Sequence, residues 1–245
     1  MPRISDRLGV HVDDVRKTFV LHHTHSLKES VVALLRRKRL TSAFNALEGI
    51  SIDIHEGESV ALLGLNGSGK STLLKLISGV LRPDAGRIGV RGRVAGLIEV
   101  GAGLHPDLSG RENVYLNAAI LGMSREETDA RFDEIVEFAE IAPFIDQEVK
   151  HYSSGMFLRL AFAVAIHTEL DVLLVDEILA VGDEPFQQKC LAKIEQLQEA
   201  GKTLVVVSHD LDMVQRVCER GIVLRKGRVV FDGPSAEAVR FMRAD

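Results

Sequence analysis

Residues 59–79 read SVALLGLNGSGKSTLLKLISG, and three features of this stretch decide the fold. Ser59 to Leu63 is a short and mostly apolar run, typical of a strand that is buried on both faces. The turn from Gly64 to Ser71 matches G-x-x-x-x-G-K-[ST], and a helical pattern follows it until Gly79. Glycines let backbone N–H groups turn inward, and a helix offers its positive N-terminal end to the same point. The unit therefore predicts a site for phosphate groups.

The turn from Gly64 to Ser71, called the phosphate loop below, is expected to bind ATP. Lys70 should reach the β- and γ-phosphates, and the Ser71 hydroxyl should ligate Mg²⁺. The alternative is a glycine-rich turn that only resembles such a loop, and the strand–helix context argues against it. The residues expected to contact the nucleotide from this unit are Gly64, Asn66, Gly67, Ser68, Gly69, Lys70, Ser71 and Thr72.

A second chemical element is the apolar strand Val172 to Val175, which ends in the adjacent carboxylates Asp176 and Glu177. Asp176 is expected to hold Mg²⁺, directly or through water, and Glu177 to orient the attacking water and accept its proton. Two acids at the end of a strand also occur as a solvated cap, and taken alone they favour neither interpretation. In an α/β chain that also carries the phosphate loop, the catalytic role is the stronger expectation.

The remaining patterns predict an α/β fold, because strands alternate with helices and the short β-branched runs are typical of a buried parallel sheet. The mostly helical stretch from about 104 to 167, called the helical lobe below, is expected to be an insertion. Ser124, with Glu127 three residues on, should cap one of its helices. Expected strands cover residues 10–20, 47–54, 59–63, 87–100, 172–175, 203–207, 222–224 and 228–231. Expected helices cover 26–40, 71–79, 111–140 with a break near Gly122, 153–167, 184–200 and 234–243.

The composition limits the class of protein. A net charge of −5 over 245 residues argues against a surface built to hold nucleic acid. Cys190 and Cys218 form neither a disulfide framework nor a zinc pattern, which fits a reducing compartment. The N-terminus does not resemble a signal peptide, and no apolar run approaches the roughly 20 residues of a membrane span. We therefore expect a cytoplasmic chain that reaches a membrane only through a partner.

Three further segments extend the pattern. Residues 152–156, YSSGM, open the helix expected over 153–167. Residues 179–183, LAVGD, follow Glu177, and His209 follows the strand expected over 203–207. In this order the segments resemble those of ATP-binding cassette (ABC) proteins over nearly the whole chain. Residues 152–156 then stand where the family has its signature segment, usually written LSGGQ. The resemblance implies a single P-loop, RecA-like cassette over residues 1–245, with a β-rich N-terminal part and the inserted helical lobe.

The signature segment is the N-terminus of a helix with a hydroxyl and a glycine, which makes it another site for an anion. By the resemblance, Ser153 and Gly155 should contact the γ-phosphate of ATP held by a second copy of the chain, in a nucleotide-sandwich homodimer. His209 should contact the γ-phosphate and assist catalysis, and Phe19 should stack on the adenine. The structural alternatives are an ordinary histidine at a strand end and a phenylalanine of the core.

The chain departs from the general family in one loop. In residues 97–106, LIEVGAGLHP, Glu99 takes the place of a glutamine that links Mg²⁺ and the attacking water to the membrane subunit. A carboxylate there can still ligate Mg²⁺, although it adds negative charge near the γ-phosphate. With Ser154 and Met156 in the signature segment, this loop resembles the branch that exports O-antigen, teichoic acid and the mycobacterial galactan as lipid-linked glycans.

Residues 26–40, SLKESVVALLRRKRL, support this branch because they predict an inserted basic amphipathic helix. A gate helix in this position faces the membrane in the proteins that the chain resembles, where basic residues meet anionic headgroups. The alternative is a solvated helix that caps the sheet edge. The resemblance implies a transmembrane permease as partner and a lipid-linked glycan as transported substrate. It also implies a location at the cytoplasmic face of the membrane, and no C-terminal carbohydrate-binding domain is expected.

The rival interpretations are an ABC ATPase of another transporter type and a soluble, non-transport ABC ATPase. The Glu99 loop and residues 26–40 argue against the first. The second usually carries long coiled coils, a second cassette or basic extensions, and this sequence has none of these.

Overall fold

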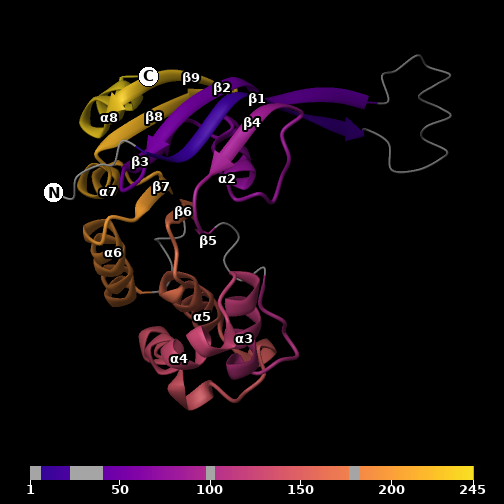
Figure 1. The fold of residues 1–245 in the computed structure, drawn as a ribbon, viewed down its shortest axis with the longest axis vertical. Helices are drawn as coiled ribbons and strands as arrows, with labels where there is room; N and C mark the ends of the chain where they lie inside the picture. Colours follow the sequence, from indigo (N-terminus) through magenta and orange to yellow (C-terminus); the bar gives the residue numbers. More distant parts are fainter. Residues whose placement is uncertain (1–6, 23–40, 98–102, 177–182, 245) are drawn as a thin grey trace.

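The computed structural model describes residues 7–22, 41–97, 103–176 and 183–244. Two sheets form the body of the molecule, and a group of helices extends from one side of it (Figure 1). The helix expected over 26–40 lies outside the described residues. The mixture of a buried parallel sheet, a β-rich N-terminal part and a helical lobe confirms the predicted α/β fold.

The central sheet has six strands in the order β5-β6-β7-β3-β8-β9. All neighbouring pairs are parallel except β8 and β9, which form a hairpin. The strands at its centre are short and almost completely buried because most of their residues are Val or Leu. Their bounds are β5 Val94–Leu97, β6 Val172–Asp176, β7 Thr203–Val207, β3 Ser59–Leu63, β8 Arg220–Arg225 and β9 Arg228–Pro234.

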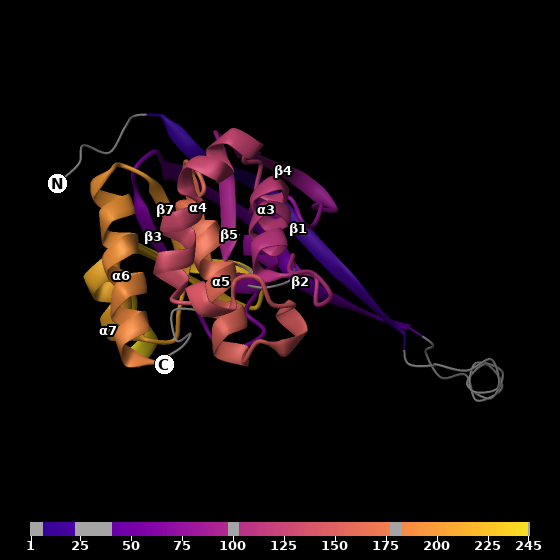
Figure 2. The same ribbon diagram turned by 90° about the horizontal axis from the view of Figure 1, so that it is seen from below.

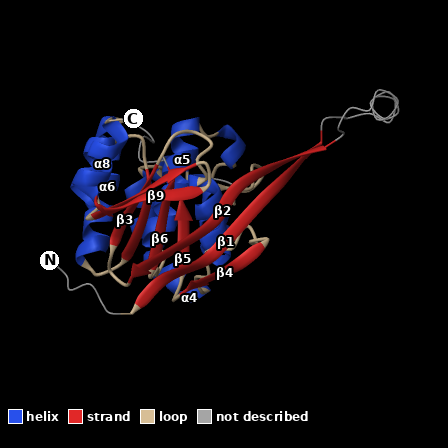
Figure 3. Cartoon of the chain, turned by 90° about the horizontal axis from the view of Figure 1, so that it is seen from above, coloured by secondary structure: helices blue, strands red, loops and turns tan. Residues whose placement is uncertain are grey.

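A second, antiparallel sheet joins β1 (Leu8–His22), β2 (Thr41–His55) and β4 (Ala85–Val90) in the order β2-β1-β4. Seen from above, it lies across the central sheet, and the far ends of β1 and β2 extend beyond the body (Figure 3). Residues 87–100 were expected to be strand-like, and the described part of that run forms two strands, β4 in one sheet and β5 in the other. Gly92, with φ +83°, lies in the turn between them.

The helical lobe contains α3 (Gly110–Ile120), α4 (Arg125–Ala139) and α5 (Ser154–His167). The predicted capping box at Ser124 and Glu127 is confirmed, and Ser109 and Glu112 form a second one at the start of α3. The predicted break falls at Gly122, whose φ is +86°. Two short 3₁₀ turns, Ala142–Phe144 and Val149–His151, connect α4 to α5. From below, these helices lie in front of the central strands (Figure 2).

The other helices are α2 (Lys70–Ile77), α6 (Glu184–Glu199), α7 (Leu211–Val217) and α8 (Ser235–Arg243). Helix α7 was not expected, since its seven residues are too few to show a clear period. Its start is defined by Asp210, whose carboxylate accepts hydrogen bonds from the N–H groups of Asp212 and Met213 at 3.1 and 3.0 Å.

The two faces of the central sheet belong to different parts of the core. Alternate residues of β3 and β6, such as Leu62 and Leu174, pack with α2 and the antiparallel sheet. Their neighbours, such as Leu63 and Val175, pack with the helical lobe and α6. The period of two along each strand thus separates α2 from α5 by the full thickness of the sheet.

Candidate nucleotide-binding site

Three parallel strands end at one edge of the central sheet, and each carries a residue predicted to act on the nucleotide. The phosphate loop follows β3, Asp176 ends β6, and His209 follows β7 by two residues. Since β6, β7 and β3 are neighbours and both Leu62 and Asp176 pair with Val207, the three ends lie side by side. The structure therefore brings these groups together at the carboxyl edge of the sheet, where α/β proteins bind ligands.

The phosphate loop approaches other backbone so closely that its first glycine has no room for a side chain. Gly64 has φ +143°, and a Cβ placed on it would lie 2.3 Å from the carbonyl oxygen of Leu224 at the end of β8. Both the backbone conformation and the close packing require glycine there. The loop is consequently held against β8 while its residues Leu65, Asn66 and Gly67 remain exposed.

Helix α2 starts differently from the helices of the helical lobe. Its N-cap is Gly69, and no side chain of the described residues caps it, whereas serines cap α3, α4 and α5. Its first turn contains no acidic residue. The N–H groups and positive dipole at this end are therefore well suited to an anion.

Lys70 is the first residue of α2, and its side chain lies inside the phosphate loop. Only 6% of it is exposed. Its ammonium donates hydrogen bonds to the carbonyl oxygens of Gly64 and Leu65 at 2.7 and 3.2 Å. Burial of a cation is costly unless an anion compensates it, which a phosphate in the loop would do.

The donor set fits ATP with Mg²⁺. The Ser68 hydroxyl is buried and has no hydrogen-bond partner within the described residues, as expected of a group that forms its hydrogen bond with a ligand. Ser71 is exposed and Asp176 is half-buried. A hydroxyl and a carboxylate are oxygen ligands of the kind that Mg²⁺ prefers. Thr72, next to Ser71, is half-buried on the same turn of α2.

Several predicted residues fall outside the part of the chain that the structure describes. They are Glu177, Glu99 and residues 179–182. The described chain resumes at Asp183, which is the N-cap residue of α6.

The signature segment forms the tip of α5. Ser153 is its N-cap, and the Ser153 hydroxyl accepts a hydrogen bond from the N–H of Met156 at 3.2 Å. Tyr152 anchors the segment to the first of the two 3₁₀ turns, since its hydroxyl donates a hydrogen bond to the carbonyl oxygen of Phe144 at 2.8 Å. Burial, with the nearby Asp146 carboxylate, raises the pKa of Tyr152, so the hydroxyl stays a donor. Ser153 is exposed and Gly155 is half-buried, which leaves the tip open to another molecule.

Sequence reasoning missed Arg159, which lies on α5 just after the signature segment. Its guanidinium bonds to Glu140 at 2.8 Å and to Asp183 at 2.6 Å. It also lies over the ring of Phe186, 4.8 Å from the centroid. Arg159 thus joins the helical lobe to the start of α6, and only its basic charge was visible in the sequence.

Phe19 lies on β1 directly opposite Phe44 of β2, so the two rings are on the same face of the antiparallel sheet. Phe19 is half-buried, and the Lys17 ammonium is 5.8 Å from its ring centroid. Phe44 is 45% exposed and was not predicted as a site residue. Both rings could meet a planar base.

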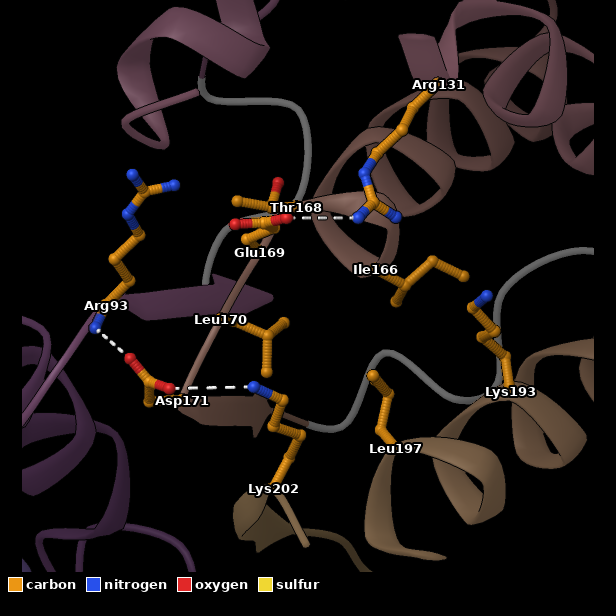
Figure 4. A pocket seen from close by; sticks show the side chains of 10 residues that line it. All are labelled: Arg93, Arg131, Ile166, Thr168, Glu169, Leu170, Asp171, Lys193, Leu197 and Lys202. Atoms are coloured by element: carbon orange, nitrogen blue, oxygen red, sulfur yellow. Dashed lines mark hydrogen bonds and ion pairs between the residues drawn. The ribbon is translucent and has the colours of Figure 1, made fainter. Parts of the chain in front are cut away.

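A cavity of about 560 Å³ lies at the opposite edge of the central sheet (Figure 4). It lies beside the starts of β5, β6 and β7, and four basic side chains line it. Arg131 pairs with Glu169 at 3.3 Å, and Lys202 pairs with Asp171 at 3.5 Å. Since carboxylates compensate much of its positive charge, this cavity is a poorer phosphate site than the uncapped end of α2.

Comparison with known proteins gives a consistent result. The family model described as ABC transporter matches residues 47–180. The ABC transporter protein AbcA of Aeromonas salmonicida is 47% identical over 91% of this chain and 71% of its own length. The O-antigen export system ATP-binding protein RfbB of Klebsiella pneumoniae is 42% identical, over 90% of this chain and 91% of its own length.

Some other relatives are much longer than this chain. The chain spans 52% of the teichoic acids export ATP-binding protein TagH of Enterococcus faecalis, at 40% identity. Among solved structures, the dimeric ATP-binding cassette MJ0796 in a post-hydrolysis state, bound to ADP and Pi, superposes with a TM-score of 0.75. It is 26% identical and covers 92% of this chain and 98% of its own.

Proposed function

The chain belongs to the ABC transporter family of ATP-binding cassettes, and from this premise we propose that it is the ATP-hydrolysing motor subunit of an exporter of lipid-linked polysaccharides. The observation that carries the catalytic part is the meeting of the phosphate loop, Asp176 and His209 at one edge of the central sheet. The names of the relatives support the transported class, since they concern export of O-antigen and teichoic acid.

In the proposed reaction, the α2 N-terminus and the Lys70 ammonium bind and neutralise the β- and γ-phosphates of ATP. Ser71 and Asp176 would hold Mg²⁺, with Glu99 as a further candidate ligand; bound there, the ion neutralises charge that develops on the phosphate oxygens. Glu177 would orient the attacking water and accept its proton, and His209 would support the γ-phosphate during in-line attack. Phe19 would stack on the adenine.

The second half of the site would come from another copy of the chain. Ser153 and Gly155 lie on the helical lobe, and α2 lies on the other face of the central sheet. The tip of α5 is thereby suited to close over a nucleotide held by the phosphate loop of a neighbouring copy. The dimeric form of the MJ0796 cassette supports this arrangement. Because ATP would bind the closed dimer more tightly than the open one, it would shift the equilibrium towards closure.

A membrane partner completes the proposal. Within the described segments, no helix is both long and apolar enough to cross a bilayer. We propose that a transmembrane permease holds the chain at the cytoplasmic face, and that the Glu99 loop and residues 26–40 contribute to the contacts with permease and membrane. Residues 26–40, and residues 98–102 of the Glu99 loop, lie outside the described residues.

Depletion of the chain tests the transport proposal. We expect a lipid-linked glycan to accumulate on the inner side of the membrane, because its export would lose its energy source. The measurement is mass spectrometry of extracted lipid-linked glycans, together with co-purification of a permease with the tagged chain. Re-expression of the wild type should clear the glycan, and a Lys70→Met variant should not. A normal glycan pool after depletion would point to another transporter type or to a non-transport ATPase.

A change at the α5 tip tests the sandwich. Gly155→Asp should leave binding of ATP to the separate chain within about twofold but abolish ATP-dependent dimers, because its carboxylate would face the partner's γ-phosphate. A carboxylate in the first turn favours the helix itself, so folding should not suffer. Light scattering with and without ATP measures the dimers. Intact dimers in this variant would contradict contact in trans.

A further inference from the structure

The turn between β8 and β9, residues 225–228, lies against the phosphate loop, although more than 150 residues separate the two segments in the sequence. The N–H of Gly227 donates a hydrogen bond to the carbonyl oxygen of Ser68 at 2.9 Å. Other carbonyls of the loop, those of Gly64 and Leu65, accept from Lys70 instead. The Ser68 carbonyl is therefore held from outside the loop.

This contact constrains the next N–H group as well. The peptide that joins Ser68 to Gly69 is planar, and in the usual trans form its C=O and N–H point in opposite directions. When Gly227 holds the Ser68 oxygen on one side, the N–H of Gly69 has to point to the other side. Gly69 is the residue directly before α2, whose N-terminal end is the proposed anion site.

The turn can approach this closely only because its third residue is glycine. Gly227 has φ +74°, and a Cβ on it would lie 2.7 Å from the carbonyl oxygen of Ala46 and 3.0 Å from the Cα of Leu47. A Cβ on Gly69 would meet the same Ala46 oxygen at 2.7 Å. Three segments of the chain therefore meet at van der Waals distance around the loop: residues 46–47 of β2, the phosphate loop and the turn.

The turn is itself anchored to β2. The carbonyl oxygen of Gly227 accepts a hydrogen bond from the N–H of Glu48 at 2.8 Å. The Arg228 guanidinium pairs with the Glu48 carboxylate at 2.9 Å, and it holds the pKa of that carboxyl below its usual value. Gly227 thus connects β2 to the loop by one hydrogen bond on each side.

We propose that the β8–β9 turn is a positioning element for the phosphate loop, in which Gly227 fixes the Ser68 carbonyl so that the N–H of Gly69 faces the nucleotide phosphates. This rests on the proposed function, because it assigns the phosphates of ATP or ADP to that loop. Gly227 acts through the Ser68–Gly69 peptide and does not itself touch the nucleotide.

A pair of glycine variants separates positioning from backbone strain. Gly227→Ala should weaken binding of a fluorescent ADP analogue, with Mg²⁺, on the order of tenfold. Gly201→Ala is the matched control. Gly201 has φ +76°, in the turn before β7, and a Cβ there would meet no atom of the described residues within 4 Å. Both variants place alanine at a left-handed φ, but only Gly227→Ala adds a Cβ that overlaps Ala46 and so displaces the turn from the phosphate loop. The control should bind the analogue within about twofold of wild type.

Steady-state kinetics give a second readout. Gly227→Ala should raise KM for ATP by a factor similar to the change in Kd, with kcat at saturating ATP within about twofold of wild type. A merely destabilised protein would lose active molecules, lowering kcat at constant KM. Arg228→Gln is the alternative test variant if Gly227→Ala does not fold. It keeps the glycine and removes the pair with Glu48, and it should raise Kd in the same direction by a smaller factor.

The outcomes are distinguishable. Wild type that fails to bind the ADP analogue would overturn the proposed function itself. Wild type that binds, with a folded Gly227→Ala variant of unchanged Kd, would overturn only the role of the turn. If Gly227→Ala does not fold, unchanged binding in Arg228→Gln would overturn it too.

Discussion

Replacing Glu177 with glutamine is expected to lower the rate of ATP hydrolysis by about 10²–10⁴-fold while ATP stays bound. Glutamine keeps the shape and the hydrogen-bonding reach of the side chain but cannot accept the proton of the attacking water. ATP that is bound and not hydrolysed should then hold the closed dimer together. Phosphate release measures the rate, and light scattering with ATP measures the dimer.

Glu199→Gln is a suitable control for this variant. Glu199 is exposed at the end of α6, and the change removes the same negative charge. Its hydrolysis rate should match that of the wild type. Full activity in Glu177→Gln would remove the assignment of Glu177 as the base and would direct attention to His209, at the end of the neighbouring strand β7.

Lys70→Met is expected to weaken ATP binding by roughly 30- to 5,000-fold, because the phosphates would lose a buried counter-charge worth about 2–5 kcal/mol. Methionine retains the apolar stem of lysine, so the packing around α2 should change little. Lys70 is 6% exposed, and water can therefore screen its charge only weakly. Calorimetric titration with ATP and Mg²⁺ measures the loss.

Lys193→Met provides the comparison for Lys70. Lys193 lies on α6 in the cavity at the opposite edge of the sheet (Figure 4). Lys193→Met makes the same lysine-to-methionine change away from the phosphate loop, so the affinity for ATP should stay within about twofold of that of the wild type. Equal losses in both variants would mean a general electrostatic effect, and the phosphate loop would no longer be assigned as the binding site.

Helices and strands with clear local sequence signals were predicted closely. Ser124 and Glu127 identified the start of α4 because a capping box depends on residues three positions apart. The strand expected over 203–207 coincides with β7, since four of its five residues are β-branched and suit a fully buried strand. The local sequence pattern was too short to predict α7. In residues 87–97 it predicted strand structure but not the division into two strands. Nothing in the sequence shows that β4 pairs with β1 while β5 pairs with β6.

The phosphate loop was recognisable from residues 59–79 by themselves, because its glycines, its lysine and its flanking periodicity all describe the conformation of one short stretch of backbone. The position of Asp176 at the end of a strand was predicted for the same reason, because the apolar run before it is local. What only the tertiary structure decided are the contacts between distant segments: the shared edge of β6, β7 and β3, the link from Arg159 to Asp183, and the hydrogen bond from Gly227 to Ser68. Local patterns record the preferences of neighbouring residues, whereas these partners are selected by how sheets and helices pack over the whole chain.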